Sequence, residues 1–232
     1  MNVVVLTGAG VSAESGIQTF RGGNGLWDGH RIEDVCTPEA FDRNPTLVYE
    51  FYNQRRRHLQ GGGIQPNAAH MAIARYEHQR PNNFVLVTQN IDDLHERAGS
   101  RQLLHMHGEL LAARCLDTGK VYGWRGDLTA NSPHPDDPNR LGRLRPHVVW
   151  FGELPLYMGR IAAAVQKCDV FVAIGTSGSV YPAAGFVSET PPGCRRVEIN
   201  AEGTAISDAF GEHHRGPATE TVPRFFDDLL RG

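Results

Sequence analysis

The first thirteen residues constrain the fold more than any other stretch of the chain. Val3 to Leu6 is an apolar run with the length and β-branching of a buried strand. Gly8, Gly10 and Ala13 follow at the G-x-G-x-x-G/A spacing, which allows a tight turn, close approach of backbone to a pyrophosphate and close helix packing. The stretch predicts an α/β fold with a nucleotide-binding first turn, although glycine turns after strands often bind nothing.

The continuation of this turn is unlike that of a dehydrogenase. No second strand ending in an acidic residue follows promptly, as the dehydrogenase pattern requires. Instead, the segment from Gly16 to Gly29 is rich in glycine and carries Phe20, Arg21 and Trp27. A segment of this kind is typical of a loop that closes over a ligand.

A polar cluster follows another buried strand in the middle of the chain. Residues 83–87 have strand character, and the stretch Thr88 to Asp92 (TQNID) comes directly after them. In open α/β folds such a cluster lies at the carboxyl end of the sheet, where ligands bind. Its amides and carboxylate suit a polar cofactor. The stretch His105 to Glu109 could place an imidazole beside it, although either stretch alone is more simply a polar turn or a surface histidine.

The alternation of strands and helices continues to the end of the chain. Strands are expected within 145–153, at 170–174, before a Gly-Thr-Ser-Gly turn, and at 195–199, before Asn200. Residues 110–145 interrupt the alternation with short β-like pieces and prolines, which we interpret as a small loop-rich insertion. N-cap and proline signals predict helices that start at Pro38, at Pro45 (to about Gln60), at Pro66 (to about His78), at Tyr157 and at Thr221 or Pro223.

Composition limits the kind of protein this is. The chain has 232 residues, 40% hydrophobic and 21% charged, which suits one sizeable domain with a small appendage. The net charge of −3 argues against nucleic acid or an anionic membrane as a partner, and no apolar run approaches the ~20 residues of a membrane span. The four cysteines form no CxxC pair, and no basic leader precedes the first strand, so we expect a cytoplasmic protein in a reducing compartment.

Six motifs, taken in order, resemble those of the sirtuins, and the resemblance covers essentially the whole chain. It is greatest to the short bacterial sirtuins. The motifs are Gly8 to Ser12 (GAGVS), Gly16 to Arg21 (GIQTFR), Thr88 to Asp92, His105 to Gly108, Val149 to Glu153 (VWFGE) and Gly175 to Ser177. The resemblance implies a Rossmann-like parallel-sheet large domain, about 1–29, 65–108 and 147–232. It also implies a small domain formed by two insertions, a helical one at about 30–64 and a loop-rich zinc-ribbon remnant at about 109–146.

The resemblance further implies NAD-dependent removal of acyl groups from protein lysine side chains. In this family NAD is a co-substrate: the acyl oxygen attacks C1′ of the nicotinamide ribose, and nicotinamide and O-acyl-ADP-ribose are released. His107 is similar to the catalytic histidine, and a neutral imidazole suits a general base acting on ribose hydroxyls. Asn90 corresponds to the residue that orders the ribose and a water, and His105 to the non-catalytic neighbour.

Other residues match the NAD-binding positions of the family. Phe20 would shield the reactive face of the cofactor from water, and Ile91 with Asp92 would hold the nicotinamide carboxamide. The implied cofactor-binding residues are Gly8, Ala9, Gly10, Ser12, Ala13, Phe20, Arg21, Trp27, Gln89, Asn90, Ile91, Asp92, Gly175, Thr176, Ser177, Asn200 and Ala218.

Five residues stand at positions that correspond to the acyl-lysine site of the family. Tyr52 and Arg55 resemble the Tyr-x-x-Arg pair of sirtuins that remove malonyl and succinyl groups, because a buried carboxylate needs a cationic fork and a hydroxyl donor. Without that context the pair would be a tyrosine at the edge of a solvated basic face. Cys36 stands where such sirtuins usually have alanine, so we expect a narrowed pocket that still accepts acetyl and succinyl groups. Val149 and Phe151 would line the tunnel.

Two other functions compete with the deacylase. A catalytically idle NAD or ADP-ribose sensor is disfavoured by the joint presence of Asn90, Asp92 and His107, and a Rossmann dehydrogenase by the missing second-strand acid. The partners implied are acylated lysine-containing proteins or peptides, and we expect a monomer.

A structural zinc ion is not expected. Most sirtuins hold zinc with four cysteines in the small domain, whereas residues 109–146 contain only Cys115. One thiolate with carboxylates is a poor structural zinc site. The possible substitute ligands are Asp117, His134, Asp136 and Asp137.

Overall fold

The computed structural model describes residues 1–19, 26–27 and 29–231. Its centre is a six-stranded sheet in which every neighbouring pair is parallel, with the order β13-β12-β11-β1-β4-β5. The α/β class with a parallel sheet is therefore confirmed. The strands are β1 (Val3–Thr7), β4 (Phe84–Thr88), β5 (Leu103–His105), β11 (Val170–Ile174), β12 (Arg195–Asn200) and β13 (Glu212–Arg215).

The strand order reverses beside β1, which has β4 on one side and β11 on the other. The carboxyl ends of β1 and β11 therefore form a topological switch point, the usual ligand-binding position in an open α/β sheet. All five residues of β1 are buried.

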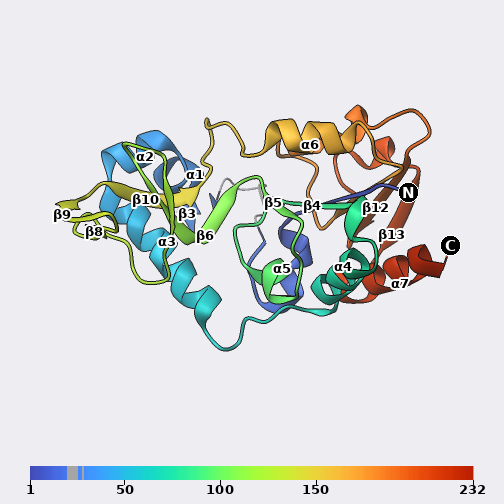
Figure 1. Ribbon diagram of the computed structural model, residues 1–232, viewed down its shortest axis with the longest axis horizontal. Helices are drawn as coiled ribbons and strands as arrows, with labels where there is room; N and C mark the ends of the chain where they lie inside the picture. Colours follow the sequence, from blue (N-terminus) through green and yellow to red (C-terminus); the bar gives the residue numbers. More distant parts are fainter. Residues whose placement is uncertain (20–25, 28, 232) are drawn as a thin grey trace.

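Helices cover both faces of this sheet (Figure 1). On one face, α4 (Ala68–Gln79) and α7 (Ala218–Arg231) pack on alternate strand residues such as Val3 and Val5. On the other face, α6 (Met158–Val165) and the 3-10 helix η4 (Ala183–Glu189) pack on Val4 and Leu6. Alternate residues of β1 thus point into two cores, as the two-residue period of a strand requires.

A second group of elements forms a smaller lobe, shown on the left of Figure 1. Its hydrophobic core is shared by residues of the helices, of β6 and of β10. In its three-stranded antiparallel sheet, β6 lies between β10 and β7. The elements are α1 (Ile32–Val35), α2 (Pro38–Arg43), α3 (Pro45–Gln60), β6 (Gly108–Cys115), β7 (Val121–Gly123), β10 (Leu144–Val148) and the hairpins β2 (Leu26–Trp27) with β3 (His30–Arg31) and β8 (Pro133–His134) with β9 (Asp137–Leu141).

The helix starts expected at Pro38 and Pro45 are confirmed. Thr37 Oγ1 accepts the Ala40 N–H at 3.0 Å, and the Asn44 side chain accepts the Leu47 N–H at 3.2 Å. Each cap satisfies one of the N–H groups that a helix start leaves free, and each proline occupies the first turn, where its missing N–H costs nothing.

Three expectations about elements were wrong. No α-helix follows the glycine turn; two 3-10 helices do, η1 (Ala9–Val11) and η2 (Ala13–Ser15). The last helix starts at Ala218, before Pro223, because Glu14 accepts both the N–H and the hydroxyl of Thr219 and stabilises the earlier turn. The strand expected within 145–153 ends at Val148.

The remaining elements are short. They are α5 (Leu94–Arg97), η3 (Pro81–Asn83) and η5 (Ser207–Ala209). No helix within the described ranges combines the length and the apolar character that a bilayer crossing requires.

Candidate active site

The glycines at the ends of β1 and β11 interlock. Gly8 donates its N–H to Ile174 O at 2.9 Å, and Gly10 donates to Gly175 O at 2.8 Å. A Cβ on Gly10 would lie 2.6 Å from the Cα of Gly175. A Cβ on Gly175, whose φ is +62°, would lie 2.4 Å from Val11 N. The two turns therefore require glycine at both positions, and they bring the expected NAD-binding residues of both motifs together.

Ser12 joins the first turn to the polar cluster after β4. Its hydroxyl donates to Asp92 Oδ2 at 3.1 Å and accepts from Asn90 Nδ2 at 3.3 Å. Asn90 Nδ2 also lies 3.2 Å from Gly8 O. Asn90 and Asp92 are both buried, and this network holds their side chains at the carboxyl end of β4.

His70, which lies on α4, supports this network. Its Nδ1 accepts the Asn67 N–H at 3.3 Å, so its Nε2 carries the proton and donates to Ser12 Oγ, also at 3.3 Å. Burial lowers the pKa of His70 to about 4, so the ring stays neutral near pH 7. The sequence signal is the Asn-x-x-His capping box at the start of α4, which gives no hint of the contact with Ser12.

The Asp92 carboxyl group has a pKa above the ordinary range of aspartate. Burial raises its pKa to about 6, while hydrogen bonds from the Leu94 N–H and from Ser12 partly oppose the shift. A perturbed carboxyl group at the carboxyl end of a sheet is a mark of a functional site.

His107 is held by the backbone of the same segment, in the neutral form that a general base needs. Its Nδ1 donates to Gln89 O at 3.1 Å, which leaves the lone pair on Nε2. Burial lowers its pKa below the ordinary 6.5, so the imidazole is neutral near pH 7. The His107 residue is half-buried.

His105 is held differently from its neighbour. Its Nδ1 contacts Asn90 O at 3.1 Å, and its Nε2 contacts Glu96 Oε1 at 2.5 Å. Burial would lower the pKa of His105, but the hydrogen bond and charge of Glu96 outweigh burial and raise it. His105 therefore tends to carry a proton and fix the Asn90 backbone.

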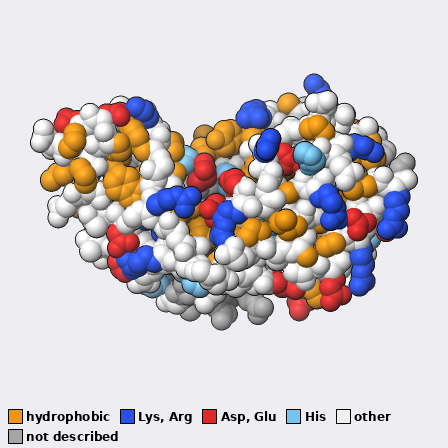
Figure 2. Space-filling view, turned by 60° about the horizontal axis from the view of Figure 1, so that its bottom comes forward, with side chains coloured by type: hydrophobic (Ala, Val, Ile, Leu, Met, Phe, Trp, Pro, Cys, Tyr) orange, Lys and Arg blue, Asp and Glu red, His pale blue; other side chains and the backbone are white. Residues whose placement is uncertain are grey.

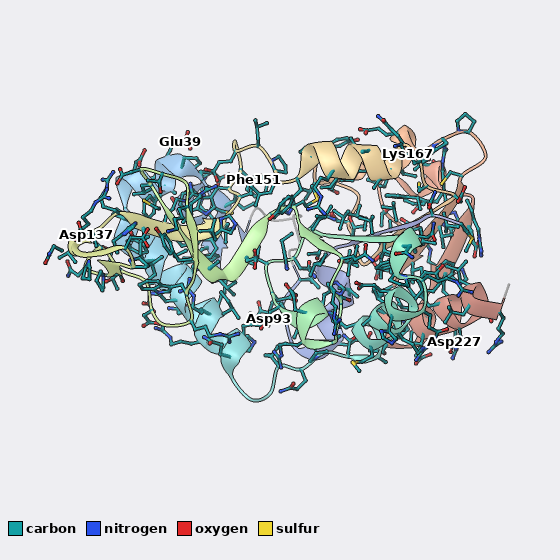
Figure 3. The ribbon with its side chains drawn as sticks, in the orientation of Figure 1. Glu39, Asp93, Asp137, Phe151, Lys167 and Asp227 are labelled. Carbon is teal, nitrogen blue, oxygen red and sulfur yellow. The ribbon has the colours of Figure 1, made fainter. Side chains whose placement is uncertain are left out.

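The expected acyl-site residues come together at the edge of the smaller lobe. The Tyr52 hydroxyl accepts the Trp150 Nε1–H at 3.0 Å and donates to Cys36 Sγ at 3.5 Å. Phe151 donates its N–H to Cys36 O at 3.0 Å. Val149 donates its N–H to His107 O at 2.8 Å. Phe151, labelled in Figure 3, lies between the two lobes with 45% of its surface exposed. Figure 2 shows that the surface is notched between the lobes.

Arg55 lies on α3 one turn after Tyr52. Its NH1 donates to Phe51 O at 2.8 Å, and its guanidinium carbon lies 3.3 Å from the centre of the Phe51 ring. Tyr52 is fully buried, and burial raises its pKa well above the ordinary value. The hydroxyl is therefore a neutral hydrogen-bond donor.

The adenosine-side residues lie at the ends of β11 and β12. Asn200 Nδ2 donates to Thr176 O at 2.7 Å, Ser177 is exposed, and Ala218 begins α7. Ala13 is exposed on η2. Phe20 and Arg21 lie outside the described residues, and only the strand position of Trp27 is described.

Possible metal ligands gather at one place in the described ranges. Ligand atoms of Glu96, His105 and Glu109 lie within 4.8 Å of one another. The set does not include Cys115, so it is not the zinc site of a typical sirtuin small domain. Near Cys115, the buried His134 Nε2 has no hydrogen-bond partner among the described atoms. Cys115 and His134 are the only Cys and His side chains in residues 109–146, which is two of the four ligands that structural zinc sites favour.

Comparison with known proteins gives a consistent result. The Sir2 family model matches residues 8–182. The chain is 56% identical to an NAD-dependent protein deacylase of Rhodopirellula baltica, over 98% of both chains, and 55% identical to one of Escherichia coli strain K12, over 99% of this chain and 82% of that protein. A solved Sir2 homologue in complex with NAD superposes with a TM-score of 0.87 at 37% identity, over 99% of this chain and 90% of that one. This chain belongs to the Sir2 family.

Proposed function

We propose that this chain is an NAD-dependent protein deacylase, which removes acyl groups from lysine side chains and yields nicotinamide and O-acyl-ADP-ribose. The observation that carries the proposal is the position of His107. Its neutral imidazole has the lone pair on Nε2 and is held by the backbone oxygen of Gln89. The next residue, Asn90, reaches Gly8 O and Ser12 Oγ at the switch point of the sheet. Two relatives over 50% identical bear the name of this activity.

The residues present fit an NAD molecule. Gly8, Gly10 and Gly175 leave no room for a side chain, which keeps the backbone at the switch point open to a pyrophosphate. Gln89 Nε2 is buried without a hydrogen-bond partner among the described atoms, as expected of a donor that serves a ligand. We assign the remaining NAD contacts to the family-matched residues named above.

The roles of the site residues follow from their contacts. NAD supplies the electrophilic ribose carbon to which the acyl oxygen is transferred. His107 Nε2 would accept a ribose hydroxyl proton, while Gln89 O holds the ring in the required tautomer. Asn90, held by Ser12, would orient the ribose. Val149 and Phe151 would line the channel by which the acyl-lysine enters.

The acyl group is proposed to be acetyl, succinyl or malonyl. Tyr52 and Arg55 lie one helical turn apart on α3, and together they offer a hydroxyl donor and a guanidinium to a carboxylate. Tyr52 O–H donates to Cys36 Sγ, so a dicarboxylic acyl group must compete with the sulfur for this proton. We therefore propose that Cys36 weakens recognition of succinyl and malonyl groups without preventing it.

A nicotinamide-release assay separates the candidate functions. Incubation with NAD and acetyl-lysine peptide should release nicotinamide and deacylated peptide in equal amounts. An NAD sensor would release none, and a dehydrogenase would instead change the absorbance of reduced nicotinamide. Either result would contradict the proposal. Mass spectrometry of acetyl, malonyl and succinyl peptides in parallel measures the acyl range.

A further inference from the structure

Two cysteines that are distant in sequence meet in the fold. Cys168 Sγ lies 3.5 Å from Cys194 Sγ. Cys168 lies between α6 and β11, and Cys194 directly precedes β12. These strands are parallel neighbours with Val170 opposite Arg195, so the sheet itself holds the two sulfurs together. They lie at the amino ends of the strands, opposite the candidate active site.

The two sulfurs differ in access. Cys168 is 2% exposed, its Sγ lies 3.1 Å from Val165 O, and burial raises its pKa to about 12. Cys194 is half-buried and lines a surface cavity of about 510 Å³. Beside it, Gly193 has no atom within 4 Å of the position where a Cβ would lie, which leaves space for this segment to shift. Small solutes can therefore reach Cys194 first, with Cys168 behind it.

We propose that Cys168 and Cys194 form a reversible oxidative modification site, which reacts with hydroperoxides to give an intramolecular disulfide. The Cys194 sulfur attacks one peroxide oxygen and breaks the O–O bond. With hydrogen peroxide this step gives Cys194 sulfenic acid and one water. The Cys168 sulfur then attacks the Cys194 sulfur, hydroxide leaves, and it takes the Cys168 proton as a second water. Two thiols are oxidised, one peroxide is reduced, and a thiol reductant reverses the reaction.

The cross-link should stabilise the fold. The Sγ atoms need to approach from 3.5 Å to the ~2.05 Å of a disulfide. The closed loop contains β11, the Gly175–Ser177 turn and η4, so the bond restricts the unfolded chain, and we expect Tm to rise by roughly 5 °C. The carboxyl ends of the strands are not cross-linked, so we expect nicotinamide release to change by less than about twofold.

Peptide mapping tests the proposal directly. Lys167 precedes Cys168, Arg195 follows Cys194, and no Lys or Arg lies between them, so trypsin releases both cysteines in one peptide. Lys167, labelled in Figure 3, lies beyond α6 from Phe151 and away from the notch. After peroxide and then a thiol-alkylating reagent, this peptide should be lighter by about 2 Da and unlabelled. Reduction before alkylation should restore two labels.

Single-cysteine variants show which residues cause the mass loss and the rise in Tm. Cys168→Ser and Cys194→Ser should show neither the mass loss nor the rise in Tm. Cys115→Ser, which alters a cysteine of the other lobe, should behave as the parent chain. Two free thiols after peroxide, sulfinic acid without a disulfide, or a disulfide between chains would each overturn the proposal. Loss of activity on oxidation that Cys194→Ser abolishes would refute the claim that the active site is unaffected.

Discussion

Two histidines separated by one residue have opposite protonation tendencies because their ring nitrogens meet different partners. His107 contacts a backbone oxygen through Nδ1, and burial lowers its pKa. His105 makes a similar backbone contact, but Glu96 at Nε2 raises its pKa. A neutral ring suits proton acceptance and a charged ring suits fixation of a backbone oxygen, so environment and not residue type separates the two roles.

Replacing His107 tests the general-base assignment. His107→Ala should lower deacylation by about 10²–10⁴-fold while NAD still binds. Because the folded pKa lies below 6.5, protonation should abolish the base only under acidic conditions, so kcat/KM should rise with pH through an acid limb below pH 6.5. Nicotinamide release measured against pH checks both points.

A matched control is His78→Ala, since His78 is exposed on α4. His78→Ala should keep both the parental deacylation rate and the fall of kcat/KM below pH 6.5. Near-parental turnover by a folded His107→Ala protein would refute the assignment of His107 as the general base.

Arg55 should discriminate between acyl groups. Arg55→Met removes the guanidinium, and a charged hydrogen bond to a carboxylate contributes about 1.5–3 kcal/mol, so kcat/KM for succinyl peptide should fall by about 10- to 100-fold. The value for acetyl peptide should change little. Arg57→Met is the control, since Arg57 lies on the same helix and pairs with Glu50 and Asp127 at the surface. Equal losses on both peptides would refute the carboxylate role.

At the scale of elements, the strand-end turns depend on close backbone contact. Gly175→Ala would place a Cβ 2.4 Å from Val11 N at a φ of +62°, so we expect a loss of more than about 3 kcal/mol and a Tm lower by roughly 6 °C or more. Gly193→Ala is matched in backbone conformation, with a φ of +85°, but meets no atom within 4 Å. It should cost only about 1–2 kcal/mol, the strain of left-handed backbone.

Calorimetry of the two variants separates crowding from backbone strain. NAD binding should be lost in Gly175→Ala and kept in Gly193→Ala. Similar Tm values for the two would show that the turns are not interlocked in solution.

Local signals made much of the fold predictable. β11 was expected over its observed range because a buried apolar run ends at a glycine turn. The helix starts at Pro38 and Pro45 were predictable because each cap and its partner lie within one turn. The short edge strands β5 and β13 carry too few residues for a period to show, and their pairing depends on neighbours elsewhere in the chain.

Side-chain contacts across elements were not predictable. Nothing in the sequence links Ser12 with His70, or Cys168 with Cys194, because each contact depends on how β1, α4, β11 and β12 pack. The hydrogen bond from Tyr52 to Cys36 likewise joins α3 to the end of α1. The motif positions gave the residues of the candidate site, while tautomers, charge states and hydrogen-bond directions required the fold.

At the scale of the whole molecule, α3 holds the smaller lobe together. Tyr49 donates its hydroxyl to Leu144 O at 2.6 Å, Asn53 donates to Leu128 O at 2.9 Å, and Arg56 donates to Leu110 O at 3.1 Å. These buried bonds join α3 to β10, to β6 and to the segment between β7 and β8 around one apolar core. Such a core can fix the lobe by packing, which is the task that zinc performs in small modules without a core.

The packing of this lobe leads to a prediction about metal. Elemental analysis of protein purified without added metal should find far less than one zinc per chain, since Cys115 is the only thiol in residues 109–146. A chelator should leave both Tm and nicotinamide release unchanged. Tyr49→Phe, which removes the buried bond to Leu144 O and leaves that oxygen unpaired, should instead lower stability by about 1–3 kcal/mol. Stoichiometric zinc, or inactivation by chelator that zinc reverses, would mean that a metal rather than packing organises the lobe.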